Sequence, residues 1–290
     1  MAPPAYAPIQ GPNGPLTKVF DDVWVVEGYV KISPMTFKRN MTILRCNGEL
    51  LITNSVRVDD KTLKEIEALG TLKYLVKLGI GHGMDDPFYQ KRYNMQIWAG
   101  AGAEWEAKFC PDGPLQASAD LEAMAVSGQP LPFFPRVRVF SFEFVRAHPD
   151  KKMQSGEFAL IFDQPVGPVL VVCDALHNYT SKSESEKVSE LPTGCFTGCM
   201  MGMIGFKGRT VMPDMFIKIF TPNKKKEDAK ADFERLLVLP WRHLIAAHGF
   251  VARDTAKEDV LAGLRTPARY GPDFMPGFLP SAGIQPTQAA

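Results

Sequence analysis

The sequence predicts an α/β fold: a four-layer αββα sandwich in which two mixed β-sheets pack face to face and helices cover both outer faces. Two observations support this prediction. The chain has two strand-rich halves, and each half also contains helical stretches. One half combines a hairpin signal with a strand–helix–strand unit, which is typical of a sheet with both antiparallel and parallel neighbours.

Length and composition are those of an ordinary soluble globular protein. The 290 residues are 45% hydrophobic and carry a formal net charge of +1. There is no basic stripe interleaved with aromatic residues, so a nucleic-acid partner is not expected. The Pro-rich start has no apolar h-region, and no uncharged apolar run is long enough for a membrane span. Five cysteines without a C-x-x-C pair indicate reduced thiols and a cytoplasmic location.

The order of elements divides the chain into three parts. We expect an irregular N-terminal arm over residues 1–18, one globular domain over 19–265, and an irregular, Pro- and Gly-rich tail over 266–290. Within the domain, Gly194, Gly198 and Gly202 lie four residues apart in the Gly- and Met-rich segment 194–208, which favours a tightly packed internal helix. A substrate lid or a homodimer contact is the alternative for this segment.

The first half reads as strands followed by a strand–helix–strand unit. Strands are predicted over residues 23–30, 41–46 and 49–56, with a hairpin turn at Asn47-Gly48. An amphipathic helix capped by Asp59 or Asp60 ends at Gly70, and a strand follows over 72–80. The polar loop after this strand lies at the carboxyl ends of the strands, where such sheets bind ligands.

The second half also combines predicted strands with predicted helices. Its predicted elements are a helical region over 102–110, strands over 137–145, 157–162 and 168–174, a helix over 225–240, a strand over 242–249 and a last helix over 255–265. Polar residues with metal-binding side chains follow the strands of both halves. They are His82, Asp85, Asp86, His148, Asp174 and His248. Because strand ends of one sandwich can converge on one edge, we expect these side chains to share a site.

Five ordered motifs resemble the metallo-β-lactamase fold superfamily. They are "LITNS" at Leu51–Ser55, "IGHGMDD" at Ile80–Asp86, "RAHPDKKMQSGEFALIF" around His148, "VLVVCDAL" around Asp174 and "LIAAHG" ending at His248-Gly249. The order and spacing match from about residue 19 to residue 265. The resemblance implies the αββα fold, a metal-dependent hydrolase activity and a small-molecule substrate.

The chain departs from the family's His-x-His-x-Asp-His motif, and two registers remain open. In the first, Gly81 and Gly83 replace the two leading histidines. The ligands of a single Zn, Fe or Mn ion are then Asp85, Asp86, Asp174 and His248. This oxygen-rich set suits Mn²⁺, Fe²⁺ or Mg²⁺ as well as Zn²⁺. Because side chains alternate along a strand, His82 would point away from the face of Gly81 and Gly83, and this favours the first register.

In the second register, slipped by one residue, His82 takes the first ligand position. The ligands are then His82, His148 and Asp174, a set that suits non-haem Fe(II) with open coordination positions. In either register His148 and Asp174 are the candidate catalytic residues. His177 and His243 have no counterpart in the family and are predicted to be structural or exposed.

Non-catalytic interpretations stand beside these. Asp86 followed by Pro87 is also a good helix start, with the carboxylate as N-cap and no metal contact. Since both motif histidines are replaced, a metal-free member of the fold with a binding or non-hydrolytic role is the main alternative to a metallo-hydrolase. An iron-dependent oxygenase is a third.

Overall fold

The structure is a computed structural model that describes residues 3–32, 35–145, 156–179, 210–211, 226–267 and 269–278. Two features that the sequence raised lie outside these residues: His148 and the segment 194–208. None of the helices in the described ranges has the length and apolar character that crossing a bilayer requires.

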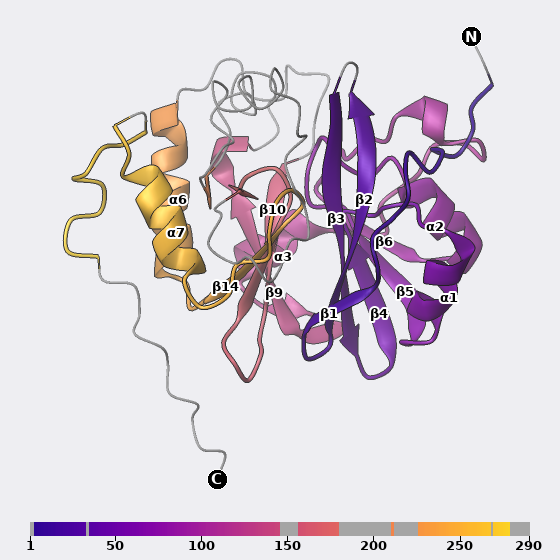
Figure 1. Ribbon diagram of the computed structural model, residues 1–290, viewed down its shortest axis with the longest axis horizontal. Helices are drawn as coiled ribbons and strands as arrows, with labels where there is room; N and C mark the ends of the chain where they lie inside the picture. The colour runs from indigo at the N-terminus through magenta and orange to yellow at the C-terminus, as the bar shows by residue number, and fades with distance from the viewer. Residues whose placement is uncertain are drawn as a thin grey trace.

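A seven-stranded mixed sheet forms the first half of the sandwich (Figure 1). Its strands follow one another in chain order: β1 (Thr17–Phe20), β2 (Val23–Ile32), β3 (Met35–Cys46), β4 (Glu49–Thr53), β5 (Thr71–Val76), β6 (Gln96–Ala99) and β7 (Ala119–Asp120). Neighbours from β1 to β4 pair antiparallel, and those from β4 to β7 pair parallel. The predicted hairpin is confirmed, because Asn47 and Gly48 both have positive φ and join β3 to β4.

A five-stranded sheet forms the second half. Its order is β14 (His243–Ala246), β11 (Val169–Val172), β10 (Glu157–Phe162), β9 (Phe134–Phe142) and β8 (Pro130–Leu131). Only the pair β11–β14 is parallel; the others are antiparallel. A short separate ladder joins β12 (His177–Asn178) to β13 (Thr210–Val211).

Helices cover the outer faces of both sheets, as predicted. On the first sheet, α1 (Asp60–Glu67) and α2 (Asp86–Tyr93) pack Leu63, Ile66 and Tyr89 against the strands. On the second, α6 (Lys230–Val238) and α7 (Ala256–Leu264) cover the opposite face. Figure 1 shows the two helix pairs at the two flanks, with both sheets between them. Helix α3 (Leu121–Ser127) contacts β6 and β9.

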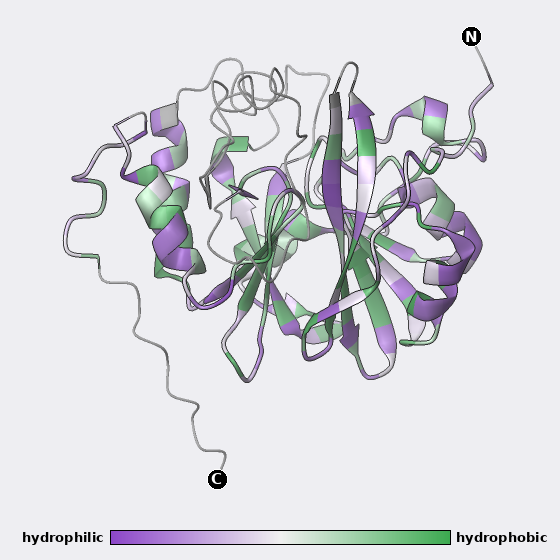
Figure 2. Cartoon of the chain, viewed as in Figure 1, coloured by the Kyte–Doolittle hydropathy of each residue, from purple (hydrophilic) through white to green (hydrophobic). Residues whose placement is uncertain are grey.

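The layer between the sheets is the apolar centre of the molecule. Leu44, Leu51 and Val76 of the first sheet meet Leu160 and Val171 of the second, and all are almost fully buried. Figure 2 shows hydrophobic residues along the strands where the sheets face each other and hydrophilic residues on the outer surfaces of α1 and α2. Burial of this apolar area is the main force that holds the sheets together.

Several element boundaries differ from those predicted. The region 102–110 forms only the 3₁₀ turn η1 (Ala107–Phe109); no residue of η1 is buried, so it has no apolar face that would pack a longer helix against the sheet. The strand expected over 72–80 ends at Val76, and the chain then leaves the sheet. Helix α2 does begin at the Asp86-Pro87 pair, but Asp85 is its N-cap residue, and no side chain caps it.

Two buried amides connect the sheets at the end of the sandwich where the polar strand ends lie. The Asn40 side chain on β3 donates to the carbonyls of Ala246 (3.0 Å) and Gly249 (2.9 Å). The Asn54 side chain donates to the carbonyl of Val172 (2.9 Å). These bonds reach the last residues of β14 and β11, so they hold the strand ends at which the candidate site begins.

Replacing Asn40 by Ala is expected to destabilise the fold. The change removes two buried hydrogen bonds and leaves carbonyl groups without that donor, a loss of about 2 kcal/mol in the free energy of unfolding. Urea denaturation followed by circular dichroism measures it. Gln96→Ala, at an exposed strand position, is the control and should change stability by less than about 0.5 kcal/mol. Equal effects of the two substitutions would contradict the linking role of Asn40.

Candidate metal centre

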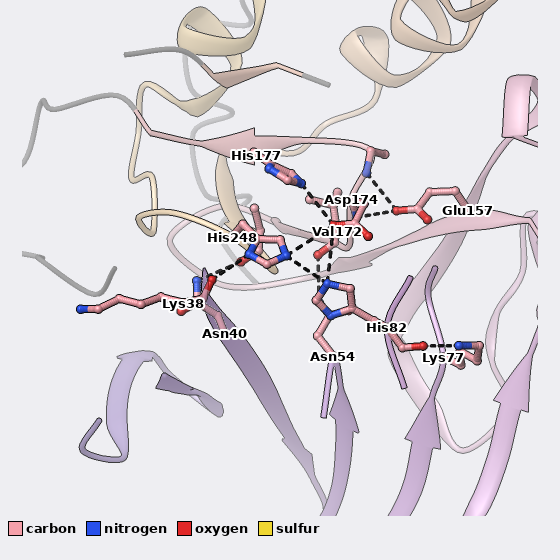
Figure 3. Close-up of polar contacts among 12 residues, drawn as sticks. Lys38, Asn40, Asn54, Lys77, His82, Glu157, Val172, Asp174, His177 and His248 are labelled. Atoms are coloured by element: carbon pink, nitrogen blue, oxygen red, sulfur yellow. Dashed lines mark hydrogen bonds and ion pairs between the residues drawn. The ribbon is translucent and has the colours of Figure 1, made fainter. Parts of the chain in front are cut away.

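Three side chains from distant parts of the chain converge at one end of the sandwich. They are His82, which lies in the loop after β5, Asp174 after β11 and His248 after β14. Their ligand atoms lie within 4.8 Å of one another (Figure 3). Asp174 Oδ1 is 3.5 Å from Nε2 of both histidines, and the two Nε2 atoms are 3.1 Å apart. No other group of this kind occurs among the described residues.

Strand register explains why Asp174 and His248 are neighbours. The parallel pair β11–β14 places Val172 beside Ala246, the last residue of each strand. Asp174 and His248 both follow two residues later, so they leave the sheet at the same level. The carboxyl ends of parallel strands meet at one edge, which brings the two side chains together.

The hydrogen bonds of His248 fix which of its ring nitrogens is free to bind an ion. Nδ1 lies 2.7 Å from the carbonyl oxygen of Lys38, an acceptor, so Nδ1 carries the proton and donates it. Nε2 then presents a lone pair to Asp174 and His82. Burial, with the neighbouring His177 and His82, lowers the pKa of His248 to about 3, so the ring is neutral near pH 7. A neutral imidazole oriented by a backbone carbonyl is the usual state of a metal-binding histidine.

Asp174 is the anion of the cluster. Its Oδ1 accepts a hydrogen bond from His177 Nε2 (3.2 Å). Burial alone would raise the pKa of this carboxyl group, but the imidazoles of His82 and His177, which lie against Oδ1, outweigh burial and hold the pKa well below its usual range. The nearby Glu157 is also fully buried, and burial together with the charge of Asp174 raises its pKa well above normal. Of the two carboxyl groups, Asp174 is therefore the ionised one.

The loop that carries His82 is shaped by packing beneath it. The buried ammonium group of Lys77 donates to the carbonyl of His82. Gly83 has φ +107, and a Cβ atom there would lie 2.7 Å from Asp86 Oδ2 and 2.9 Å from Lys77 Nζ. Gly83 is thus required by backbone conformation and by crowding. Among the described residues, His82 Nδ1 has no hydrogen-bond partner.

Asp85 and Asp86 face other partners, which corrects the expectation that they share a site with Asp174 and His248. Asp85 forms a buried ion pair with Arg39. Asp86 accepts hydrogen bonds from Ser55 Oγ (2.6 Å) and Trp105 Nε1 (2.7 Å). The prediction relied on the alternation of side chains in a strand, but β5 ends at Val76, so alternation does not apply to residues 79–86.

The described cluster combines the two predicted registers. His82 comes from one proposed ligand set, His248 from the other, and Asp174 belongs to both. His177, predicted to be structural or exposed, is buried and bonded to Asp174. Its position three residues after Asp174 was the only sequence signal for this contact. His243 is buried at the other end of β14, where its Nε2 contacts the Val166 carbonyl and its Nδ1 accepts from the Asp254 backbone.

The chemistry of these atoms fits a divalent cation. Because the His248 proton points to Lys38, no proton of that ring lies between its Nε2 and Asp174 Oδ1. One His82 proton can serve only one of these two acceptors. A positive ion among the three atoms would remove the repulsion between their lone pairs. Two imidazoles and a carboxylate are ligands typical of zinc and of non-haem iron.

Comparison with known proteins shows where this architecture occurs. No family model matches the chain, and no curated protein matches it either. Among solved structures, the metallo-β-lactamase FIM-1 from Pseudomonas aeruginosa, in its mono-zinc form, is 14% identical with a TM-score of 0.51, covering 87% of this chain and 94% of its own. TMB-1 is 8% identical with a TM-score of 0.54, covering 86% and 94%. VMB-1 is 11% identical with a TM-score of 0.51, covering 84% and 92%.

These likenesses extend over most of the chain and agree with its two mixed sheets and its outer helices. The sequence identities are low, so the likeness concerns the fold. The chain therefore has the metallo-β-lactamase fold.

Proposed function

We propose that the chain is a metal-dependent hydrolase that holds one divalent ion through His82, Asp174 and His248. The observation that carries this proposal is the convergence of His82 Nε2, Asp174 Oδ1 and His248 Nε2 within 4.8 Å of one another. One solved structure of the same fold is a metallo-β-lactamase in a mono-zinc form, which supports the same reaction class. The substrate would be a small molecule with an ester, thioester, lactone or phosphoester bond.

The ion would supply Lewis-acid polarisation of the scissile carbonyl or phosphoryl group and activation of a water molecule. The surrounding residues would position the ligands. The Lys38 carbonyl orients the His248 ring, and His177 holds the Asp174 carboxylate through its Oδ1. His148, a candidate ligand or proton carrier from the sequence, lies outside the described residues, and a role in the reaction remains part of this proposal.

An iron-dependent oxygenase is a second candidate. It is favoured by one observation: the cluster consists of two histidines and one carboxylate, the set that non-haem Fe(II) enzymes use with open coordination positions. A metal-free binding protein is the third possibility, and metal analysis distinguishes it from both.

Removal of any proposed ligand is expected to abolish metal binding. His82→Ala, Asp174→Asn and His248→Ala should each reduce the amount of bound metal at least about tenfold, because loss of a residue that only hydrogen-bonds to a metal ligand already weakens metal affinity by that much. Elemental analysis of protein purified without chelator measures the content. His243→Ala is the matched control: it also removes a buried histidine, but at the far end of β14 from His248.

Retention of metal by all three ligand variants would place the ion elsewhere. If the unaltered protein binds no zinc, iron or manganese after incubation with an excess of each, the metal-free alternative replaces the proposal.

The loaded protein is expected to hydrolyse at least one member of a panel of esters, thioesters, lactones and phosphoesters. The zinc and Fe(II) forms should be assayed in parallel, with oxygen consumption recorded for the Fe(II) form. Hydrolysis by the zinc form that disappears in Asp174→Asn supports the hydrolase. Oxygen consumption by the Fe(II) form, without hydrolysis by either form, would instead support the oxygenase.

The metal-free protein is expected to lose stability as the pH falls below about 6.5. In the unfolded chain a histidine has its ordinary pKa near 6.5, whereas the folded-state pKa of His248 is about 3. Between these values the unfolded chain binds a proton that the native chain does not, so the free energy of unfolding falls by up to about 5 kcal/mol. Urea denaturation over a pH series measures it, and His248→Ala should flatten the dependence. An unchanged slope in that variant would contradict the assignment.

A further inference from the structure

The segment that carries Asp174 is held by a carboxyl group that is not itself a proposed ligand. Glu157, the first residue of β10, has no solvent exposure. Its Oε1 accepts hydrogen bonds from the backbone N–H groups of Asp174 (2.7 Å) and Ala175 (2.9 Å), as Figure 3 shows. Two successive backbone donors are thus fixed at the point where the chain leaves β11 and turns towards the histidines.

The other carboxyl oxygen of Glu157 occupies a space that a glycine leaves open. A Cβ atom at Gly79 would collide with Glu157 Oε2 and would lie 2.7 Å from Cys173 Sγ. Just before this glycine, the backbone N–H of Phe158 donates to the Leu78 carbonyl (2.8 Å), so β10 is joined to the segment that leads to His82. The Glu157 carboxyl group therefore lies between the two loops that carry His82 and Asp174.

Apolar packing does not explain why the Glu157 carboxyl group is buried or why it accepts two backbone hydrogen bonds. Burial of a carboxyl group opposes folding unless its hydrogen bonds compensate. Here the compensation comes from the backbone of the segment that aims Asp174 Oδ1 at three imidazoles. Such outer-shell hydrogen bonds typically fix the orientation of metal ligands.

We propose that Glu157 is a positioning residue that fixes Asp174, through the backbone of residues 174 and 175, in the orientation that binds the ion. This inference rests on the proposed metal-binding function. Without the two hydrogen bonds, the Asp174 carboxylate would sample other directions, and part of the binding free energy would be spent on ordering it.

The test compares the metal affinities of two variants by competition with a chromophoric chelator, using Zn²⁺ as the probe. Glu157→Gln keeps an oxygen that accepts from both N–H groups, so its affinity should stay within about threefold of the unaltered protein. Glu157→Leu is similar in size but has no acceptor, and its affinity should fall about 10- to 100-fold. Rescue by the amide separates positioning from simple occupation of space.

Gln164→Leu is the matched control. Gln164 lies just beyond the other end of β10, is buried, and donates to the Asp21 carbonyl (2.6 Å). Its replacement should lower the melting temperature of the metal-free protein, as Glu157→Leu should, but should leave the Zn²⁺ affinity unchanged.

A second pair of variants keeps the test valid if Glu157→Leu does not fold. Gly79→Ala should displace the carboxyl group and weaken Zn²⁺ binding about tenfold. Gly100→Ala crowds the ring of Phe158 on the same strand, with 2.6 Å between the added Cβ and the nearest ring carbon, and should not change the affinity.

The outcomes separate the two proposals. If the unaltered protein binds Zn²⁺ and Glu157→Leu and Gly79→Ala bind it within threefold, the positioning role is overturned while the metal centre stands. A loss of affinity as large in Gln164→Leu as in Glu157→Leu would likewise overturn it. If the unaltered protein binds no divalent ion, the proposed function and this inference fail together.

Discussion

The parallel pairing of β11 with β14 is the constraint on which the candidate site depends. It places the ends of these strands side by side, with Val172 opposite Ala246. Asp174 and His248, two residues further along each chain segment, therefore leave the sheet next to each other. A slip of one residue would turn the side chains of one strand to the other face and would separate Asp174 from His248. Asn40 secures the same end of β14 from the opposite sheet, so the register of one sheet is tied to the position of the other.

Ionisable groups are concentrated under this edge. Lys77, Glu157 and Asp174 are all buried, and burial lowers the pKa of Lys77 while it raises that of Glu157. Buried charges oppose folding unless they are compensated. The pattern of one acid with a lowered pKa and one with a raised pKa limits the net charge in the interior. It leaves a single well-defined anion, Asp174, facing the imidazoles.

Much of the architecture could be predicted from the sequence, and the reasons are local. Local patterns specify single elements: the turn at Asn47-Gly48, the amphipathic face of α1, and the apolar runs of β10 and β11. The order of these elements then predicted the four layers of the fold. The order of polar strand ends located Asp174 and His248. The proposed ligand in the loop after β5, His82, could not be assigned from the sequence, because the end of that strand is set by tertiary contacts. Lys77 and Gly83 shape the His82 loop through contacts that form only in the folded chain. No local sequence pattern shows that Asp85 forms an ion pair with Arg39.

The separation of the proposed ligands along the chain has a consequence for the stability of the protein in a cell. His82 and His248 are 166 positions apart, and they follow strands of different sheets. An ion bound by both would act as a reversible cross-link that closes a very long loop, and such closure can favour the native state by about 5 kcal/mol. Chains made when the metal is scarce would then open more often and reach proteases sooner. The abundance of the protein would therefore follow the supply of the metal.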